Sequence, residues 1–204
     1  MQVWKRALVG LAALVATACS GGAPAPATGD MVMGQANAPV TIIEYASPTC
    51  PVCKTFHDDV LPTIKTKYLD TGKAKLVFRE MPSHNPPVDV AIFQLARCAG
   101  ADKYFAMMDD VYARQQEIDQ AAHGASGARP GLLALGAKFG LSAERANECI
   151  ANAEGMQRIT DGARHASEVL GVNGTPSILV NDKLLSGFGV DTISAAVDAE
   201  LAGK

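Results

Sequence analysis

The sequence predicts an α/β fold in which one mixed sheet is flanked by helices and interrupted by a helical block. Residues 40–80 have the pattern of a strand, a helix and a strand, and residues 177–201 have that of two strands and a helix. Between them, residues 86–170 are helical almost throughout. Because each end contributes strands and a helix that must bury an apolar face, both ends are expected to share a single sheet.

The N-terminal half begins with an apolar run over residues 40–46 that is rich in β-branched side chains, which is typical of a buried strand. A helix is expected over residues 51–68, where apolar residues recur at every fourth position, and Pro62 should kink it. Alternating apolar residues over 73–80 predict a second strand. These elements form a β-α-β unit.

Five helices are expected in the block that follows, and the insertion they form is expected over about residues 84–155. Ser142 has the side chain of an N-cap, Gly171 ends the last helix, and His123 is expected in a loop. The helices are predicted at residues 86–98, 101–115 and 130–139, from Ser142 to about 153, and at 156–170.

The C-terminal half is predicted to be a β-β-α unit. Residues 177–180 read as a short buried strand, Asn181 and Asp182 supply a turn, and residues 183–186 return as a second strand. A terminal helix is expected over residues 191–201. The folded domain is therefore expected to extend from residue 40 to residue 204.

The first residues have the features of an export signal. Lys5 and Arg6 precede an apolar stretch, and Ala16-Thr17-Ala18 supplies a cleavage signal, so residues 1–18 are expected to be a signal peptide. The stretch is too short to span a bilayer of about 30 Å. Residues 19–39, rich in Gly, Ala and Pro, are expected to form a flexible tether.

Ala16-Thr17-Ala18-Cys19 resembles the lipobox of bacterial lipoproteins, which implies that Cys19 is lipidated; plain secretion is the alternative. The formal net charge of −3, with no cluster of Lys and Arg, argues against nucleic acid as a partner. The chain also has no polybasic patch that could bind anionic membrane lipids. Membrane attachment would therefore depend on a lipid attached to Cys19.

Cys50-Pro51-Val52-Cys53 follows the first strand and opens the first helix. Two thiols at positions i and i+3 can close a small disulfide ring, and the free N–H groups of a helix N-terminus favour a thiolate. A structural disulfide and half of a zinc site are the alternatives, but zinc needs a second ligand pair, which the chain lacks. The motif therefore predicts redox chemistry.

Five cysteines in an oxidising compartment leave one unpaired unless Cys19 is modified. The remaining four form two pairs, Cys50 with Cys53 and Cys98 with Cys149. Export favours a structural disulfide for Cys98 and Cys149, which lie on apolar faces of two helices, and two unlinked core thiols are the alternative.

The C-x-x-C motif after a strand, the helical insertion and Gly174-Thr175-Pro176-Ser177 before a strand resemble the DsbA family of thioredoxin-fold oxidoreductases. Residues 38–45 and 53–57 are similar to the branch that includes bacterial lipoproteins and membrane-anchored forms, and alphaproteobacterial members resemble this chain in having a second cysteine pair. The resemblance covers about residue 40 to the C-terminus. It implies a thioredoxin fold with a helical insertion, and neither a cofactor nor a metal is expected.

The resemblance also implies roles for five residues. Cys50 would be the exposed nucleophile and Cys53 the resolving thiol. Pro176 matches the cis-proline beside the active-site disulfide, with a trans turn proline as the alternative, and Thr175 would present its backbone to an extended substrate. Glu44 matches a buried acid that relays a proton to or from Cys53; a solvent-facing carboxylate on an edge strand is the alternative.

The expected function is an envelope thiol:disulfide oxidoreductase that transfers the Cys50–Cys53 disulfide to unfolded or reduced secreted proteins and is reoxidised by a membrane partner similar to DsbB. A monomer is expected. Val52 cannot assist a thiolate, which favours a less oxidising pair than in enteric DsbA proteins, which have His there. The alternatives are a reductase or isomerase with a DsbD-like partner, and a non-catalytic lipoprotein that binds copper or a client chain. His57 is expected on a solvated helix face.

Overall fold

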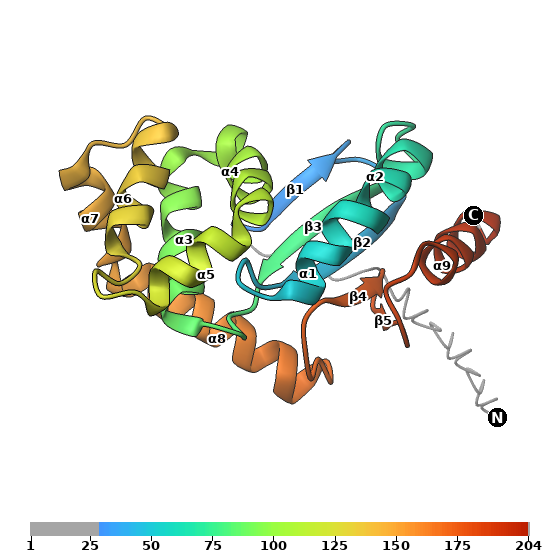
Figure 1. The fold of residues 1–204 in the computed structure, drawn as a ribbon. Helices are drawn as coiled ribbons and strands as arrows, with labels where there is room; N and C mark the ends of the chain where they lie inside the picture. Colours follow the sequence, from blue (N-terminus) through green and yellow to red (C-terminus); the bar gives the residue numbers. More distant parts are fainter. Residues whose placement is uncertain (1–28, 204) are drawn as a thin grey trace, which may run out of the picture.

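The computed structural model describes residues 29–203, shown in colour in Figure 1. The expected signal peptide over residues 1–18, the lipidation of Cys19 and the first part of the expected tether lie outside the described residues. Within residues 29–203, no helix is both long and apolar enough to cross a membrane.

A five-stranded mixed sheet forms the centre of the fold, with the strand order β1-β3-β2-β4-β5. The central strand β2 (Val40–Ala46) is parallel to β3 (Ala74–Glu80) and antiparallel to β4 (Ser177–Val180). The short β5 (Lys183–Leu184) pairs with β4 at one edge. Every residue of β2 is buried, which explains why its sequence is mostly apolar rather than alternating.

The domain begins earlier than the expected tether over residues 19–39 allows. Strand β1 (Met31–Gly34) pairs antiparallel with β3, and Met31 is 9% exposed within the core. This strand covers what would otherwise be an exposed edge of β3. Only four residues long and set in a Gly- and Ala-rich segment, it lacks the β-branched run that marks β2.

The helix after β2 is present but irregular. α1 (Pro51–Thr55) and α2 (Leu61–Ile64) are each followed by a π-helical segment, Phe56–Val60 and Lys65–Leu69. Pro62 has no N–H to donate to the carbonyl four residues earlier, so the regular bonding pattern cannot pass through it. The expected disturbance at Pro62 therefore coincides with a change of hydrogen-bonding pattern within one continuous helical segment.

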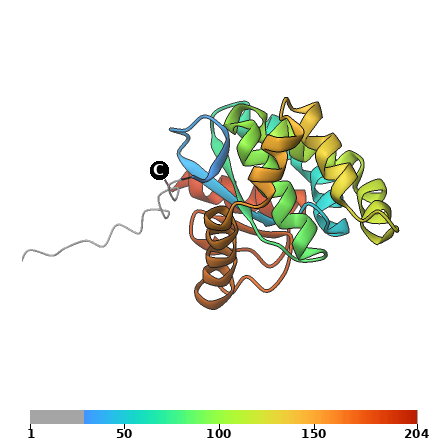
Figure 2. The ribbon, with the colours of Figure 1, turned by 90° about the vertical axis from the view of Figure 1, so that its left-hand side faces the viewer.

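Helices α3 to α7 gather at one end of the sheet, and α8 leads from them back to β4 (Figures 1 and 2). Helix α5 was not expected, and His123 ends it rather than lying in a loop. Its sequence has a single large apolar residue, Ile118, and so gives no apolar stripe. The helices are α3 (Pro86–Ala99), α4 (Ala101–Ala113), α5 (Gln115–His123), α6 (Arg129–Lys138), α7 (Ala143–Ile150) and α8 (Ala153–Val169).

Two layers of helices cover the two faces of the sheet. α2, the π-helical segments on either side of it and the terminal helix α9 (Val190–Ala202) share one apolar cluster with Ile42 of β2. On the opposite face, Ile43 packs with Ala166 of α8. The arrangement is the expected thioredoxin fold with a helical insertion between a β-α-β and a β-β-α half. Neighbouring residues of β2 thus face different layers, and Glu44 points to the same side as Ile42.

A buried acid at the end of β3 fastens the insertion to the sheet. The carboxylate of Glu80, with a side chain 3% exposed, accepts a hydrogen bond at 2.6 Å from Arg97 of α3 and one at 2.7 Å from Arg158 of α8. The hydroxyl of Tyr104 in α4 also donates to it, at 3.2 Å. Three helices therefore meet one strand end through one satisfied carboxylate, which fixes where the insertion stands relative to β2 and β3.

Candidate active site

Cys50 and Cys53 stand at the start of α1, directly beyond the buried end of β2. Cys50 is the N-cap residue in an extended conformation, and Pro51 occupies the first helical position, where its missing N–H costs nothing. Both cysteines are free thiols, 7% and 0% exposed, so the expectation that Cys50 is exposed is wrong. Val52 between them is 44% exposed. The two cysteines of the motif are thus buried, and Val52 between them faces solvent.

The two thiols have opposite acidities. A hydrogen bond from Cys53 is the largest cause that lowers the pKa of Cys50, to about 5; burial opposes it, and the Thr175 side chain and the backbone N–H groups of Val52 and Cys53 assist it. Burial raises the pKa of Cys53 far above its ordinary value. At neutral pH the pair is therefore a Cys50 thiolate that accepts a hydrogen bond from a Cys53 thiol.

The loop before β4 faces the motif. The peptide bond between Thr175 and Pro176 is cis, so the alternative of a trans turn proline is wrong. The sulfur of Cys50 lies 3.4 Å from the Thr175 carbonyl oxygen. The Thr175 hydroxyl lies 2.8 Å from the hydroxyl of Ser83. If Ser83 is the donor in that pair, the Thr175 hydroxyl proton is available to the Cys50 sulfur.

Glu44 is buried on the central strand, so the alternative of a solvent-facing edge carboxylate is wrong. It is 3% exposed, and burial raises its pKa from 4.5 to about 8. Burial raises the pKa of the neighbouring Tyr112, and the charges of Glu44, Cys53 and Cys50 raise it further. Glu44 is therefore an uncharged acid at neutral pH, able to give up a proton.

Asp89 of α3 is a residue that the sequence analysis missed. It is fully buried, and its carboxylate accepts hydrogen bonds from the N–H and hydroxyl of Thr49 at 2.9 and 2.7 Å, the hydroxyl of Ser47 at 2.8 Å and the N–H of Ser83 at 2.9 Å. It thereby joins the turn before Cys50 to the loop that contacts Thr175. An Asp in the first turn of a helix is normally explained by the helix dipole, so no sequence signal marked its burial.

The unexpected helix α5 also reaches the motif. The side-chain amide of Gln115, its first residue, donates to the carbonyl oxygens of Pro48 at 2.8 Å and Cys50 at 2.9 Å. Tyr112, at the end of α4, donates to the Ser47 carbonyl at 3.4 Å. The insertion therefore holds the backbone of the turn from Ser47 to Cys50 as well as its side chains.

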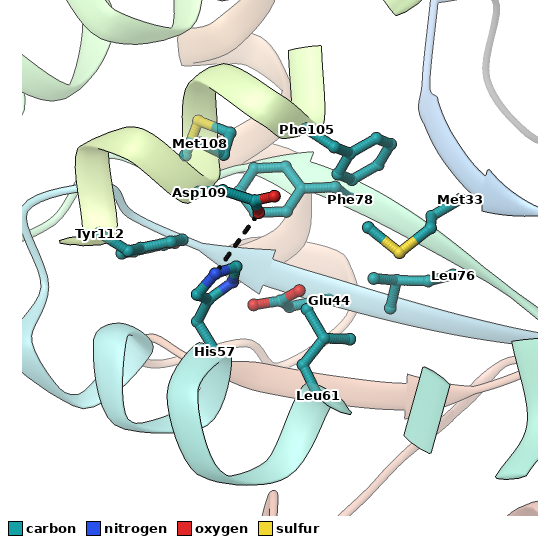
Figure 3. Close-up of a pocket in the computed structure, with 10 residues that line it drawn as sticks. All are labelled: Met33, Glu44, His57, Leu61, Leu76, Phe78, Phe105, Met108, Asp109 and Tyr112. Atoms are coloured by element: carbon teal, nitrogen blue, oxygen red, sulfur yellow. Dashed lines mark ion pairs between the residues drawn. The ribbon is translucent and has the colours of Figure 1, made fainter. Parts of the chain in front are cut away.

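His57 does not lie on a solvated helix face as expected. Its side chain is 20% exposed, and its ring packs on Tyr112 with centroids 4.8 Å apart. Its Nε2 lies 3.4 Å from a carboxylate oxygen of Asp109, and Figure 3 shows this contact beside Glu44. The partners of His57 come from α4, which is distant in sequence, so the periodicity of α1 could not reveal them.

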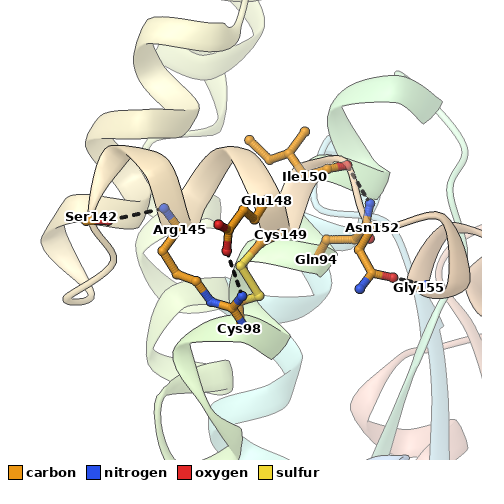
Figure 4. The surroundings of a disulfide bond; sticks show 9 residues. All are labelled: Gln94, Cys98, Ser142, Arg145, Glu148, Cys149, Ile150, Asn152 and Gly155. Carbon is orange, nitrogen blue, oxygen red and sulfur yellow. Dashed lines mark hydrogen bonds and ion pairs between the residues drawn. A yellow bond between two sulfur atoms is a disulfide. The ribbon is translucent and has the colours of Figure 1, made fainter.

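The second cysteine pair lies away from the motif. Cys98 of α3 and Cys149 of α7 are joined by a disulfide with Cα atoms 6.2 Å apart (Figure 4). Ser142 caps α7 by accepting a hydrogen bond from the N–H of Arg145 at 3.1 Å. The bond ties the two helices of the insertion to each other. Among residues 29–203 no cluster of three or more His, Cys, Asp or Glu could hold a metal ion.

Comparisons with known proteins agree with this geometry. A family model described as thioredoxin matches residues 27–199. A Rickettsia conorii protein, provisionally named a protein-disulfide oxidoreductase, is 34% identical over 172 residues, which make up 84% of this chain and 60% of that relative. The chain thus spans less than two thirds of that relative. Disulfide bond formation protein D of Bacillus subtilis is 27% identical over 188 residues, covering 86% of this chain and 79% of the relative.

Among solved structures, the crystal structure of alpha-DsbA1 from Wolbachia pipientis matches with a TM-score of 0.77 at 26% identity, covering 87% of this chain and 94% of that chain. Oxidised BdbD from Bacillus subtilis matches with a TM-score of 0.74 at 21% identity, covering 89% and 98%. The second likeness shows the fold alone.

The acidity of Cys50 should depend on Cys53. Because the hydrogen bond from Cys53 is the largest cause of the lowered pKa, Cys53→Ala should raise the pKa of Cys50 by about 1 unit or more. The pH dependence of thiolate ultraviolet absorbance measures this. Val52→Ala, which keeps the backbone N–H groups, is the matched control and should leave the pKa near about 5. Equal pKa values in the two variants would contradict the assignment.

Asp89→Asn should destabilise the domain and disturb the motif. The new amide places donor hydrogens against Thr49, Ser47 or Ser83, so we expect a loss of about 2–4 kcal/mol in the free energy of unfolding, measured by urea denaturation. Asp182→Asn, at an exposed turn, should change it by less than about 0.5 kcal/mol. A stability of Asp89→Asn equal to that of the control would show that the four hydrogen bonds add nothing.

Proposed function

Because the chain belongs to the thioredoxin family, we propose that it is a thiol:disulfide oxidoreductase that passes a Cys50–Cys53 disulfide to the thiols of secreted proteins. The observation that carries the proposal is the asymmetry of the two thiols. Cys50 is a low-pKa sulfur beside the Thr175 loop, and Cys53 is a buried thiol one helical turn inside. A structural disulfide requires no such difference, whereas exchange chemistry does.

The exchange proceeds in two displacements. A substrate thiolate attacks the sulfur of Cys50, a substrate–Cys50 disulfide forms, and Cys53 leaves with the electron pair of the broken bond. Cys53 then takes a proton, for which the buried and uncharged Glu44 is the proposed donor. A second substrate thiolate attacks the substrate sulfur, and Cys50 leaves as a thiolate. The substrate has lost two electrons, which the two cysteines now hold.

The direction of flow follows from which form of the protein is stabilised. A thiolate that is stable at Cys50 lowers the free energy of the reduced form, while the disulfide has no corresponding ionisation, so the pair should act as an oxidant. This argues for the oxidase over the reductase or isomerase. It also argues against the weakening expected from Val52, because the lowered pKa comes from Cys53, Thr175 and backbone N–H groups and requires nothing from the side chain at position 52.

Substrates are expected to be unfolded or reduced chains that bind in extended form. The backbone carbonyl of Thr175 lies 3.4 Å from the sulfur of Cys50, and main-chain hydrogen bonds there would give affinity that tolerates different sequences. Val52, at 44% exposure, adds an apolar contact next to the reacting sulfur. Binding of this kind suits an enzyme that meets many clients.

The enzyme is proposed to work in the cell envelope. The export signal over residues 1–18 and the lipobox-like Ala16-Thr17-Ala18-Cys19 support secretion and a lipid anchor at Cys19. An oxidising compartment also suits the disulfide between Cys98 and Cys149. A membrane partner similar to DsbB would reoxidise the dithiol by accepting its two electrons.

Covalent trapping tests the catalytic role. In Cys53→Ser the mixed disulfide on Cys50 cannot be resolved. The Cys50 thiolate should attack a peptide that bears one activated disulfide and expel the activating thiol, and the attached peptide should appear as a mass increase under non-reducing conditions. Cys50→Ser should trap nothing, because Cys53 is fully buried. A Cys53→Ser variant that forms no adduct would refute the oxidoreductase.

The reduction potential tests the direction. We expect a value above the approximately −270 mV of thioredoxin, measured against a glutathione series. The folded pKa of Cys50 lies below its unfolded value of 9.0. Its thiolate therefore stabilises the reduced form above that pH, and the contribution is lost as the pH falls through about 5.

The ionisation of Cys50 also determines how steeply the reduction potential changes with pH. Above about pH 5.5 reduction takes up one proton per two electrons, so the potential should fall by about 30 mV per pH unit rather than about 59 mV. A potential at or below that of thioredoxin would favour the reductase.

A further inference from the structure

Glu44 raises a question of proton supply that the exchange chemistry leaves open. If Glu44 gives a proton to Cys53 in each cycle, its carboxylate must recover one from solvent before the next. Yet Glu44 is 3% exposed on the central strand, so bulk water does not reach it directly. The inference that follows rests on the proposed function and concerns the path of this proton.

A small cavity adjoins Glu44. Its volume of about 10 Å³ is close to the minimum for one water molecule, and such a site holds water only when polar groups border it. Three polar side chains besides Glu44 do so: His57, Asp109 and Tyr112. Figure 3 shows the carboxyl of Glu44 and the ring of His57 next to each other, with Asp109 beyond the ring. The remaining lining is apolar: Met33, Leu61, Leu76, Phe78, Phe105 and Met108.

His57 and Asp109 lead from this cavity to the surface. Nε2 of His57 lies 3.4 Å from the carboxylate of Asp109, whose side chain is 59% exposed. Burial lowers the pKa of His57, against the opposing charges of Asp109 and Asp58, so the imidazole is neutral at neutral pH. A neutral imidazole donates at one nitrogen and accepts at the other, which is what a group that passes protons requires.

The other charged or titratable neighbours do not offer a second route. Burial raises the pKa of Tyr112 well above its usual value, so the phenol stays protonated, and its hydroxyl donates to the Ser47 carbonyl. Lys54 and Asp58 pair with each other at 2.6 Å on the exposed side of the helix. Lys54 lowers the pKa of His57 through its charge, as the last of four causes.

We propose that His57 and Asp109 form the exit through which Glu44 exchanges its proton with solvent, by way of one water molecule in the cavity. When Cys53 leaves as a thiolate, it takes the proton of Glu44. The carboxylate takes a proton from the cavity water, the water takes one from His57, and His57 regains one from solvent at Asp109. Reoxidation runs the same transfers in reverse, and no electrons move along this path.

The test uses dithiothreitol as a client-free dithiol. The protein is turned over at neutral pH between dithiothreitol and excess oxidised glutathione, so that Glu44 must regain its proton in every cycle, and the loss of dithiothreitol thiols is followed. His57→Gln, which keeps size and hydrogen bonding but cannot ionise, should slow turnover at least about tenfold. Because the exit only returns Glu44 to its starting state, the reduction potential should not change. Asp109→Asn should have the same effect to a smaller degree.

Two further variants separate proton transfer from a structural effect. His57→Ala should be slow, and added imidazole should restore its rate. In a Glu44→Gln background, His57→Gln should cause no additional slowing, because both substitutions interrupt one path. The exposed pair His123 and Asp119 on α5, 3.6 Å apart, supplies the matched controls, His123→Gln and Asp119→Asn, which should react at the wild-type rate.

The outcomes distinguish the two proposals. Wild-type protein that does not react with dithiothreitol refutes the oxidoreductase itself. Wild-type protein that reacts, with His57→Gln reacting equally fast, overturns the proton exit and leaves the oxidoreductase intact. The exit is also overturned if His57→Gln is slow but its reduction potential shifts, and imidazole does not restore the rate of His57→Ala. That combination would show a rearranged site.

Discussion

The buried carboxylate of Asp89 is the constraint on which the geometry of this protein depends. The cysteines stand on a turn at the end of a strand, and a turn alone would leave their positions loosely defined. Asp89 binds both residues that flank Pro48, Ser47 and Thr49, and also the N–H of Ser83. Because the charge is fully buried, its hydrogen bonds are strong and any loss of one is costly. The carboxylate of Asp89 on α3 thereby fixes the position of the reacting sulfur and that of the loop that faces it.

The helical insertion thus belongs to the chemistry as well as to the fold. It contributes Gln115 and Tyr112 to the turn and Asp109 to the surroundings of His57. These residues cluster where α4 passes into α5, next to the start of α1. The disulfide between Cys98 and Cys149 and the ion pairs of Glu80 hold the same insertion at its other end. An insertion fastened at both ends keeps polar groups in place around a sulfur whose acidity depends on hydrogen bonds.

The sequence predicted the order of elements well, because β2 is a mostly apolar run and β3 and most helices carry a clear apolar period. The sequence did not predict elements whose formation depends on contacts with other parts of the fold. Strand β1 is a strand only because β3 offers an edge, and α5 buries little of its own surface. In the candidate site, the cysteines, Glu44, Thr175 and Pro176 were marked by motif and resemblance. Asp89, Gln115 and the contacts of His57 were not, since each depends on a partner tens of residues away and on burial that no local pattern records.

The pairing of β1 has a consequence for how the molecule would face a surface that holds it. Met31 pairs with Phe78 near the end of β3, and β3 runs parallel to β2, whose end leads to Cys50. The chain therefore enters the fold at the same end of the sheet as the reacting sulfur, where Arg97 binds the carbonyl of Gly29 and Arg79 pairs with Asp30. A restraint on the chain at Gly29 would therefore hold the molecule by the end of the sheet that carries Cys50, and not by the edge formed by β5.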